Sequence, residues 1–161
     1  MKKLLTALLV VGSMGMTGPV FAQDFEKGAR AQGAKDYATA MKEWRFLAER
    51  GHAGAQFQLA MMYDYGLGAL QDYSEAVYWY RKAAEQGDVG AQYNLGFMYA
   101  NGHGVLRDNT FAHMWLNIAA SKGFDRAATK RDETAEKMSA ADISKAQELA
   151  RECVKKQYKG C

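Results

Sequence analysis

The three histidines of this 161-residue chain are the side chains most able to bind a metal ion. His52, His103 and His113 are scattered along the sequence, and the His-Glu-x-x-His pair of a zinc peptidase does not occur. The two cysteines lie near the C-terminus and form no cluster with zinc spacing. The sequence therefore predicts no metal site and no cofactor.

Nucleophilic catalysis would need an activated serine or cysteine, and its short signatures are missing. Neither Gly-x-Ser-x-Gly nor Ser-x-x-Lys with Lys-Thr-Gly occurs. The carboxylate pairs Asp24/Glu26 and Asp132/Glu133 lie in polar stretches, which is typical of solvated surface rather than of a general acid and base. We therefore expect a binding protein and not an enzyme.

The first 22 residues have the pattern of a secretory signal peptide. Two lysines precede an apolar run over 4–11, and the Val-Phe-Ala at 20–22 suits cleavage after Ala22. A membrane anchor is the weaker alternative, because the run is too short to cross a bilayer core of ~30 Å, and no cysteine follows it to carry a lipid. We expect a periplasmic or secreted chain of 139 residues (161 minus 22) without a membrane span.

Export also decides how the cysteines are interpreted. Cys153 and Cys161 are an isolated even pair, which predicts a disulfide in an oxidising compartment. It would close a loop of about nine residues and stabilise the tail by at most roughly 2.5 kcal/mol. The alternative is two free thiols; a Cys-x-x-Cys redox site is excluded by the spacing.

The bulk composition points to a helical protein with a mixed surface. Without the two signal lysines, 19 basic residues face 18 acidic ones, a net charge of +1. Nucleic-acid binding needs a clustered basic face, so this balance argues against it. The single proline lies in the signal, and good helix formers are abundant, while the alternating pattern of strands is absent.

A repeat defines the architecture. FQLAMMYDYGLGALQD at 57–72 recurs 36 positions later as YNLGFMYANGHGVLRD at 93–108, and 16 of 36 positions are identical between 36–71 and 72–107. A period of this length is typical of stacked supersecondary units, each of which buries its apolar face against the next.

Within each unit the pattern predicts helix, turn, helix. Asp72 is an expected N-cap with Glu75 three residues on, as in a capping box, and Asp88 begins the second helix. The Gly-x-Gly at 102–104 ends that helix; it is no dinucleotide fingerprint, which would follow a strand. Gly96 in mid-helix predicts a close approach between helices. The large aromatic residues at helical spacing are expected in the core: Trp44, Tyr63, Trp79, Tyr80, Tyr99 and Trp115.

The motif A-E-Q-G-D-x-x-A-Q-x-N-L-G-x-M-Y-x-N-G-x-G-V-x-x-D resembles the Sel-one-like repeat family, relatives of tetratricopeptide repeats with a longer loop. The resemblance covers 36–71 and 72–107, and 108–123 fits a third first helix. It implies an α/α solenoid that serves as an adaptor for protein partners. Some secreted members have been linked to β-lactam or peptidoglycan binding, but those carry a cysteine pair in each repeat, and here the repeats have none.

The expected fold is an all-α, right-handed α/α solenoid of about two and a half helix-turn-helix repeats, with capping helices at both ends. A final helix is predicted over roughly 140–157, begun by Ser139 and Asp142. The expected organisation is a signal peptide over 1–22 and one domain over 23–161, divided into an N-terminal cap (24–35), repeats 36–71 and 72–107, a partial repeat (108–138) and a C-terminal cap helix with tail (139–161).

The first helices of successive units are expected to line a concave face. Side chains there that the core does not need are candidate ligand contacts: Lys42, Arg45, Tyr78, Arg81, Asn94, His113 and Asn117. Arg45 and Arg81 share one register, which would suit a carboxylate group; the alternative is that each pairs with an acidic neighbour in the adjacent unit.

The sequence thus favours an exported, non-enzymatic interaction module that holds a segment of a cell-envelope protein in a groove. One alternative is a peptidoglycan or β-lactam binding protein, with or without weak hydrolase activity. Another is a regulator that caps a second solenoid through its own exposed repeat edge.

Overall fold

The computed structural model describes residues 19–161, which form eight α-helices and no strand. The predicted signal peptide lies almost wholly outside these residues. The prediction of an all-α fold is confirmed. The helices are α1 (Pro19–Gly33), α2 (Tyr37–Glu49), α3 (Ala53–Tyr65), α4 (Tyr73–Ala84), α5 (Val89–Asn101), α6 (Asn109–Ser121), α7 (Asp125–Ala135) and α8 (Ala140–Lys155).

Aspartates begin the helices at the spacing of the repeat. The side chains of Asp36, Asp72 and Asp108 cap α2, α4 and α6, and Asp88 caps α5. Each accepts hydrogen bonds of 2.8–3.1 Å from backbone amides of the first turn. These amides have no partner within the helix, so the caps fix where each helix begins.

The capping box predicted at Asp72 is only half formed. The amide of Asp72 donates to the carbonyl of Tyr63 at 3.0 Å, because the loop folds back onto α3. The carboxylate of Glu75 is therefore free of the amide and accepts a hydrogen bond from Trp79 Nε1 at 3.2 Å instead.

The Gly-x-Gly motifs end the second helices, as predicted. Gly66 and Gly102 adopt left-handed φ angles of 66° and 73°, and their amides donate to the last turn of α3 and α5. Gly104 allows the loop to lie against α4, because a Cβ at this position would collide with the backbone carbonyl of Tyr73. Both glycines of the motif are therefore needed, one to stop a helix and one to pack the loop.

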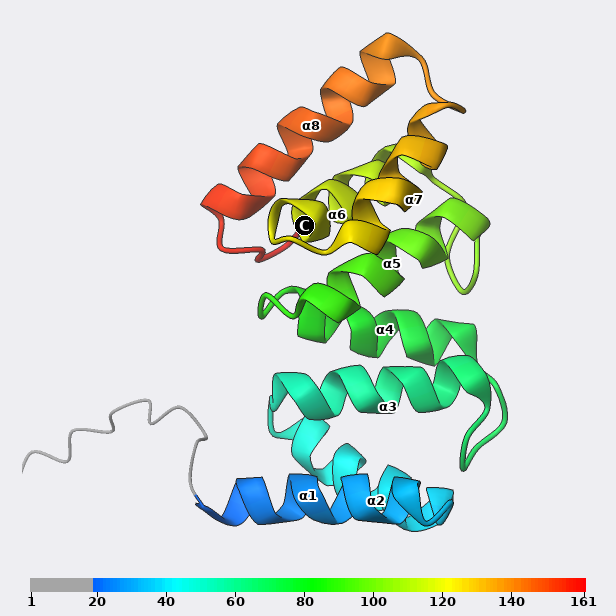
Figure 1. Ribbon diagram of the computed structural model, residues 1–161, viewed down its shortest axis with the longest axis vertical. Coiled ribbons are helices and arrows are strands. Elements are labelled where there is room, and N and C mark those ends of the chain that lie inside the picture. The colour runs from blue at the N-terminus through cyan, green and yellow to red at the C-terminus, as the bar shows by residue number, and fades with distance from the viewer. Residues whose placement is uncertain (1–18) are drawn as a thin grey trace, which may run out of the picture.

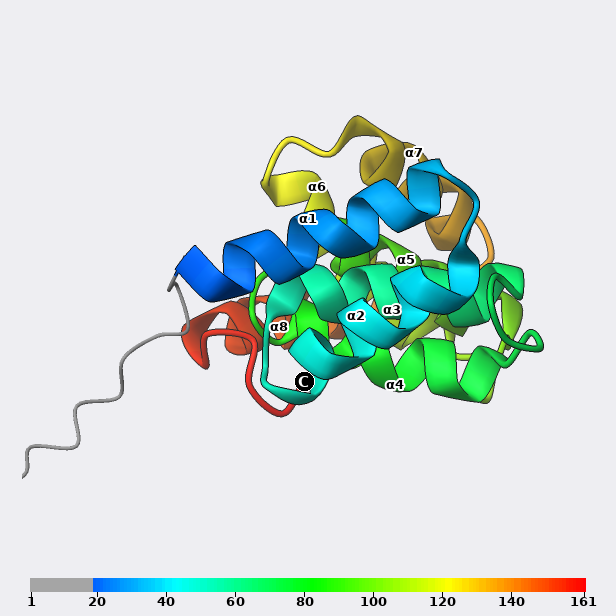
Figure 2. The same cartoon turned by 90° about the horizontal axis from the view of Figure 1, so that it is seen from below.

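The helices stack along the long axis of the molecule (Figure 1). Each packs mainly against its neighbours in sequence, and the exception is α8, which turns back onto α6. Seen from below, α1 lies across the lower end of the stack (Figure 2). No helix within 19–161 combines the length and the apolar character that crossing a bilayer requires.

The close helix approach predicted at Gly96 is confirmed. A Cβ at Gly96 would lie 2.8 Å from Leu116 Cγ and 3.1 Å from the carbonyl oxygen of Ala112, so α5 and α6 touch there. Of the six aromatic residues predicted for the core, five are buried and Tyr99 is partly buried against it.

Both ends of the stack are covered by helices. At the lower end, the Phe25 ring of α1 lies 5.1 Å from the imidazole of His52, in a stacked arrangement. At the upper end, α8 buries Ala146, Ala150 and Cys153. The sulfur atoms of Cys153 and Cys161 are joined, with Cα atoms 5.6 Å apart, as a disulfide requires.

Candidate functional site

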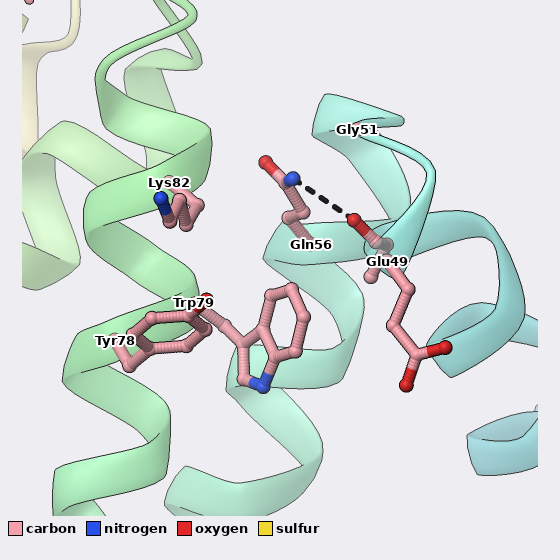
Figure 3. Close-up of a pocket in the computed structure, with 7 residues that line it drawn as sticks. Glu49, Gly51, Gln56, Tyr78, Trp79 and Lys82 are labelled. Atoms are coloured by element: carbon pink, nitrogen blue, oxygen red, sulfur yellow. Dashed lines mark hydrogen bonds between the residues drawn. The ribbon is translucent and has the colours of Figure 1, made fainter.

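An open pocket lies between the end of α2, the start of α3 and the middle of α4 (Figure 3). We call it the α4 pocket; its volume is about 430 Å³. It is lined by Ala48, Glu49, Gly51, Gln56, Tyr78, Trp79 and Lys82.

The floor of the α4 pocket is held rigidly by the core. Trp79 is only 8% exposed. Gln56 is buried and donates from Nε2 to the carbonyl of Ala48 at 3.0 Å, the bond drawn in Figure 3. Its Oε1 accepts from Gln86 Nε2 at 2.7 Å. The floor is therefore preformed, and both polar atoms of the Gln56 amide are already hydrogen-bonded within the protein.

The rim of the pocket is amphipathic. Tyr78 is 50% exposed and packs edge-on against Trp79, with ring centroids 4.9 Å apart. The ammonium of Lys82 lies 5.6 Å from the Tyr78 ring centroid. Glu49 also lines the pocket, but its carboxylate points away from both residues in Figure 3, so the rim on α4 presents one aromatic ring and one positive charge.

The same site recurs one repeat later. Adding 36 to each lining position gives Ala84, Glu85, Gly87, Gln92, Met114, Trp115 and Ile118, and five of the seven residues are identical. The two that differ are the rim residues, where Tyr78 and Lys82 are replaced by Met114 and Ile118.

The later site is covered by the chain's own C-terminal segment. Met114, Trp115 and Ile118 are each 1% exposed and belong to the same core cluster as Ala150 and Cys153 of α8. The apolar rim residues Met114 and Ile118 are therefore covered by apolar side chains of α8.

The tail that follows α8 completes this cover. A Cβ on Gly87 would lie 3.4 Å from the Tyr158 ring, so the ring rests on the turn equivalent to Gly51. The ammonium of Lys122 donates to the carbonyl of Gly87 at 3.0 Å and lies 4.1 Å from the centre of the Tyr158 ring.

A second hollow, of about 300 Å³, lies between the end of α3, the start of α4 and the middle of α5. We call it the Asp64 pocket. It is lined by Asp64, Tyr65, Gln71, Tyr73, Tyr93, Asn94, Phe97 and His103.

The predicted site residues are not brought to one surface. Tyr78 lines the α4 pocket and Asn94 the Asp64 pocket, while Lys42 is exposed on α2. Asn117 accepts a hydrogen bond from Arg131 at 3.3 Å and lines a third hollow, between α6 and α8.

His113 is withdrawn from the surface. It is 3% exposed, and no residue within 19–161 bonds its Nδ1 atom. Burial, followed by the nearby Arg131 charge, lowers the pKa of His113, so the imidazole stays neutral in the core.

The two equivalent arginines have partners within their own repeats. Arg45 donates to the hydroxyl of Tyr63 and Arg81 to the hydroxyl of Tyr99, the latter at 2.8 Å. The alternative interpretation, an acidic partner in the adjacent unit, is not what residues 19–161 show: the partners are tyrosines 18 positions further on. Contact of either guanidinium with a ligand stays a prediction.

Sequence reasoning missed two kinds of site residue. Gln56 and Gly51 were visible as repeat identities, but a repeated residue is not by itself a pocket residue. Asp64 was visible as a departure from the repeat, since its counterpart is Ala100. Among the residues that the structure describes, no group of three His, Cys, Asp or Glu side chains is placed to hold a metal ion.

The stacked hairpins and their open pockets define an α/α repeat protein, and comparison with known proteins gives its family. Residues 53–88 and 89–124 match the Sel1 repeat. These matches keep the 36-residue period and begin each unit at its second helix. The chain therefore carries two repeats of the Sel1-like family, whose repeats are generally protein-interaction modules without enzymatic activity.

Two solved structures are similar over most of this chain. One is a protective antigen present in uropathogenic Escherichia coli strains that displays an SLR fold; it is 28% identical, with a TM-score of 0.80, over 86% of this chain and 31% of that protein. The other is a Sel1 repeat protein from Oxalobacter formigenes, 30% identical, with a TM-score of 0.65, over 80% of this chain and 53% of that protein. The chain thus spans about a third and about half of their lengths. No curated protein matches it.

Proposed function

We propose that this protein is an exported, non-enzymatic adaptor that binds a helical segment of a cell-envelope protein in the α4 pocket. The observation that carries the proposal is the pair of equivalent sites. One is filled by α8 and the tail of the same chain, and the other has the same floor but no cover from residues 19–161.

The filled site indicates what shape of ligand the open site accepts. α8 presents small side chains, Ala150 and Cys153, to the face of α6 that carries Met114 and Ile118. An amphipathic helix with small residues on one face would lie on α4 in the same way.

The rim explains why the open site can stay empty in water. Tyr78 and Lys82 combine apolar surface with polar ends, so the pocket avoids the exposed apolar patch that a methionine and an isoleucine would create. The ring and the charge also offer a partner helix two distinct contacts. An apolar side chain of the partner would pack on the Tyr78 ring, and a carboxylate of the partner would pair with the Lys82 ammonium. The envelope location is supported by the signal-peptide pattern of the first 22 residues.

The test is site-specific photo-crosslinking in the native host. A photoreactive phenylalanine analogue replaces Tyr78, and the matched control carries it at Gln147, an exposed position on α8. Crosslinked material is taken from the periplasmic and extracellular fractions, and the intact mass of the uncrosslinked protein shows whether cleavage follows Ala22.

The expected result is one envelope protein captured from Tyr78 and not from Gln147. The crosslinked peptide maps to an amphipathic helix, and a synthetic copy of that helix competes. Capture of glycan fragments instead would favour the peptidoglycan alternative. Equal capture from both positions, or a protein found only in the cytoplasm, would contradict the proposal.

A further inference from the structure

Asp64 is a carboxylate that no lysine or arginine of residues 19–161 pairs with. The residue lies in the last turn of α3, where the carbonyl ends of the helix already carry partial negative charge. Its side chain is half-buried, and burial raises the pKa of this carboxyl above its usual value. No ion pair among residues 19–161 includes it.

One face of the carboxylate is fixed and the other is free. The Tyr80 hydroxyl donates to Asp64 Oδ2 at 3.1 Å. Burial, with Asp64 adding to it, raises the pKa of Tyr80, so this hydroxyl keeps its proton. Within the described chain, no group donates a hydrogen bond to Asp64 Oδ1. The backbone beneath is held by Gln71, whose Nε2 donates to the Asp64 carbonyl at 2.6 Å.

The pocket that contains Asp64 is rich in aromatic rings. The Asp64 pocket is lined by the rings of Tyr65, Tyr73, Tyr93 and Phe97. The ring of Tyr73 stacks on His103, with centroids 4.7 Å apart and planes 14° apart, and Tyr65 is 64% exposed at the mouth. The faces of such rings carry partial negative charge and attract cations.

The repeat does not require these residues. The counterpart of Asp64 is Ala100, that of His103 is Leu67, and that of Tyr65 is Asn101. A half-buried carboxylate and an exposed tyrosine that the neighbouring unit lacks are therefore additions to the fold. Two basic side chains lie close by. His103 lines the same pocket, and its charge acts to lower the pKa of Asp64, against the larger effect of burial. Lys130, whose ammonium is 5.6 Å from the Phe97 ring, is paired with Glu133 at 2.8 Å.

We propose that the Asp64 pocket binds a cationic side chain, the guanidinium of arginine or the ammonium of lysine, presented by a partner protein. The cation lies between Asp64 Oδ1 and the aromatic rings, and the amide of Asn94 completes its surroundings. It supplies the positive charge that the end of α3 lacks.

The site is separate from the α4 pocket. Asp64 and Gln56 lie eight residues apart on α3, which is about 12 Å along the helix. The inference therefore goes beyond the proposed function, and it holds or fails independently of what crosslinks to Tyr78.

The test uses small probes on the isotopically labelled protein. N-acetyl-arginine amide, N-acetyl-lysine amide and the neutral N-acetyl-citrulline amide are titrated while amide NMR signals are followed. We expect the two cationic probes to shift signals of residues around Asp64, Asn94 and His103, and the citrulline probe to bind at least about tenfold more weakly, because it lacks the charge.

Two variants with the same change in charge make the result specific. Asp64→Asn keeps an acceptor for the Tyr80 hydroxyl, so its melting temperature should equal or exceed that of the wild type, while binding of the cationic probes falls at least about tenfold. Glu49→Gln, in the α4 pocket, should leave probe binding unchanged. The proposal is overturned by equal binding of the citrulline probe, by full binding to Asp64→Asn, by an equal loss in Glu49→Gln, or by no shifts in this pocket at millimolar probe.

Discussion

At the scale of single residues, the buried glutamines show how one side chain joins two helices. Gln56 and Gln92 occupy the same position in successive units, and each donates from Nε2 to the carbonyl of an alanine at the end of the preceding helix, at 3.0 and 3.2 Å. Each of these carbonyls also accepts from the amide of the glycine that follows the helix, Gly51 at 3.0 Å and Gly87 at 2.9 Å, so the glutamine adds a second hydrogen bond. The units differ at the other end: Gln56 Oε1 accepts from Gln86, whereas Gln92 Oε1 is buried without a partner in the described chain.

This difference predicts unequal effects of the same substitution. Gln56→Leu should lower the free energy of unfolding by about 1–3 kcal/mol, because the Gln86 amide loses its partner and the Ala48 carbonyl keeps only the Gly51 amide. Gln92→Leu should lower the free energy of unfolding by less, because it also removes the unpaired buried acceptor Gln92 Oε1. Urea unfolding followed by tryptophan fluorescence measures the free energy of unfolding of both variants. Equal losses would contradict the inference that the two glutamines differ in hydrogen bonding.

At the scale of helices, α4 and α6 show how rim residues decide what a repeat unit can contact. Both present a tryptophan on a floor of alanine and glutamine. Met114 and Ile118 make α6 a docking face for α8, whereas Tyr78 and Lys82 leave α4 open. Small residues set the spacing between helices, as at Gly96, where α5 meets Leu116 of α6.

Gly96→Ala should therefore destabilise the protein, although alanine is the better helix former. Its Cβ would press on Leu116 Cγ at 2.8 Å, and the displaced helices should cost about 1–3 kcal/mol. Gly33→Ala is the matched control, since a Cβ there meets nothing within 4 Å and alanine should stabilise α1 by up to about 1 kcal/mol. If thermal unfolding shows the same shift for both variants, packing at Gly96 is not the cause.

At the scale of the whole molecule, each helix contacts mainly its neighbours in the stack, and a disulfide bond holds the C-terminal end. The tail after α8 turns through Gln157 and Tyr158, which adopt left-handed φ angles of 52° and 65°. Each such angle costs roughly 1–2 kcal/mol in a residue other than glycine. The Cys153–Cys161 bond and the packing of Tyr158 on Gly87 hold this conformation.

Reducing the disulfide should loosen this end alone. The tail gains conformational freedom, at a cost of at most about 2.5 kcal/mol, and Tyr158 leaves the turn at Gly87. Hydrogen exchange should accelerate in the last turns of α8 and in α6, while α2 and α3 keep their protection, because repeat units are stabilised by their neighbours. Cys161→Ser should reproduce the effect without reductant. Equal loss of protection from α2 to α8 would show instead that the molecule opens as one unit.

The sequence by itself determined the repeated helical hairpin. The aspartate caps, the Gly-x-Gly stops, the small residue at Gly96 and the buried aromatic residues all recur at 36 positions, and each acts through local chemistry or through contact with the adjacent helix. The isolated pair of cysteines, taken with the signal-peptide pattern, likewise predicted a disulfide that the structure forms.

Only the tertiary structure decided which of these residues meet. It showed that Arg45 and Arg81 bond tyrosines of their own units, that His113 is buried, and that the equivalent of the α4 pocket is covered by a helix from the far end of the chain. Whether a side chain faces a pocket depends on what lies across from it. That neighbour can come from any part of the chain, so a period in the sequence cannot specify it.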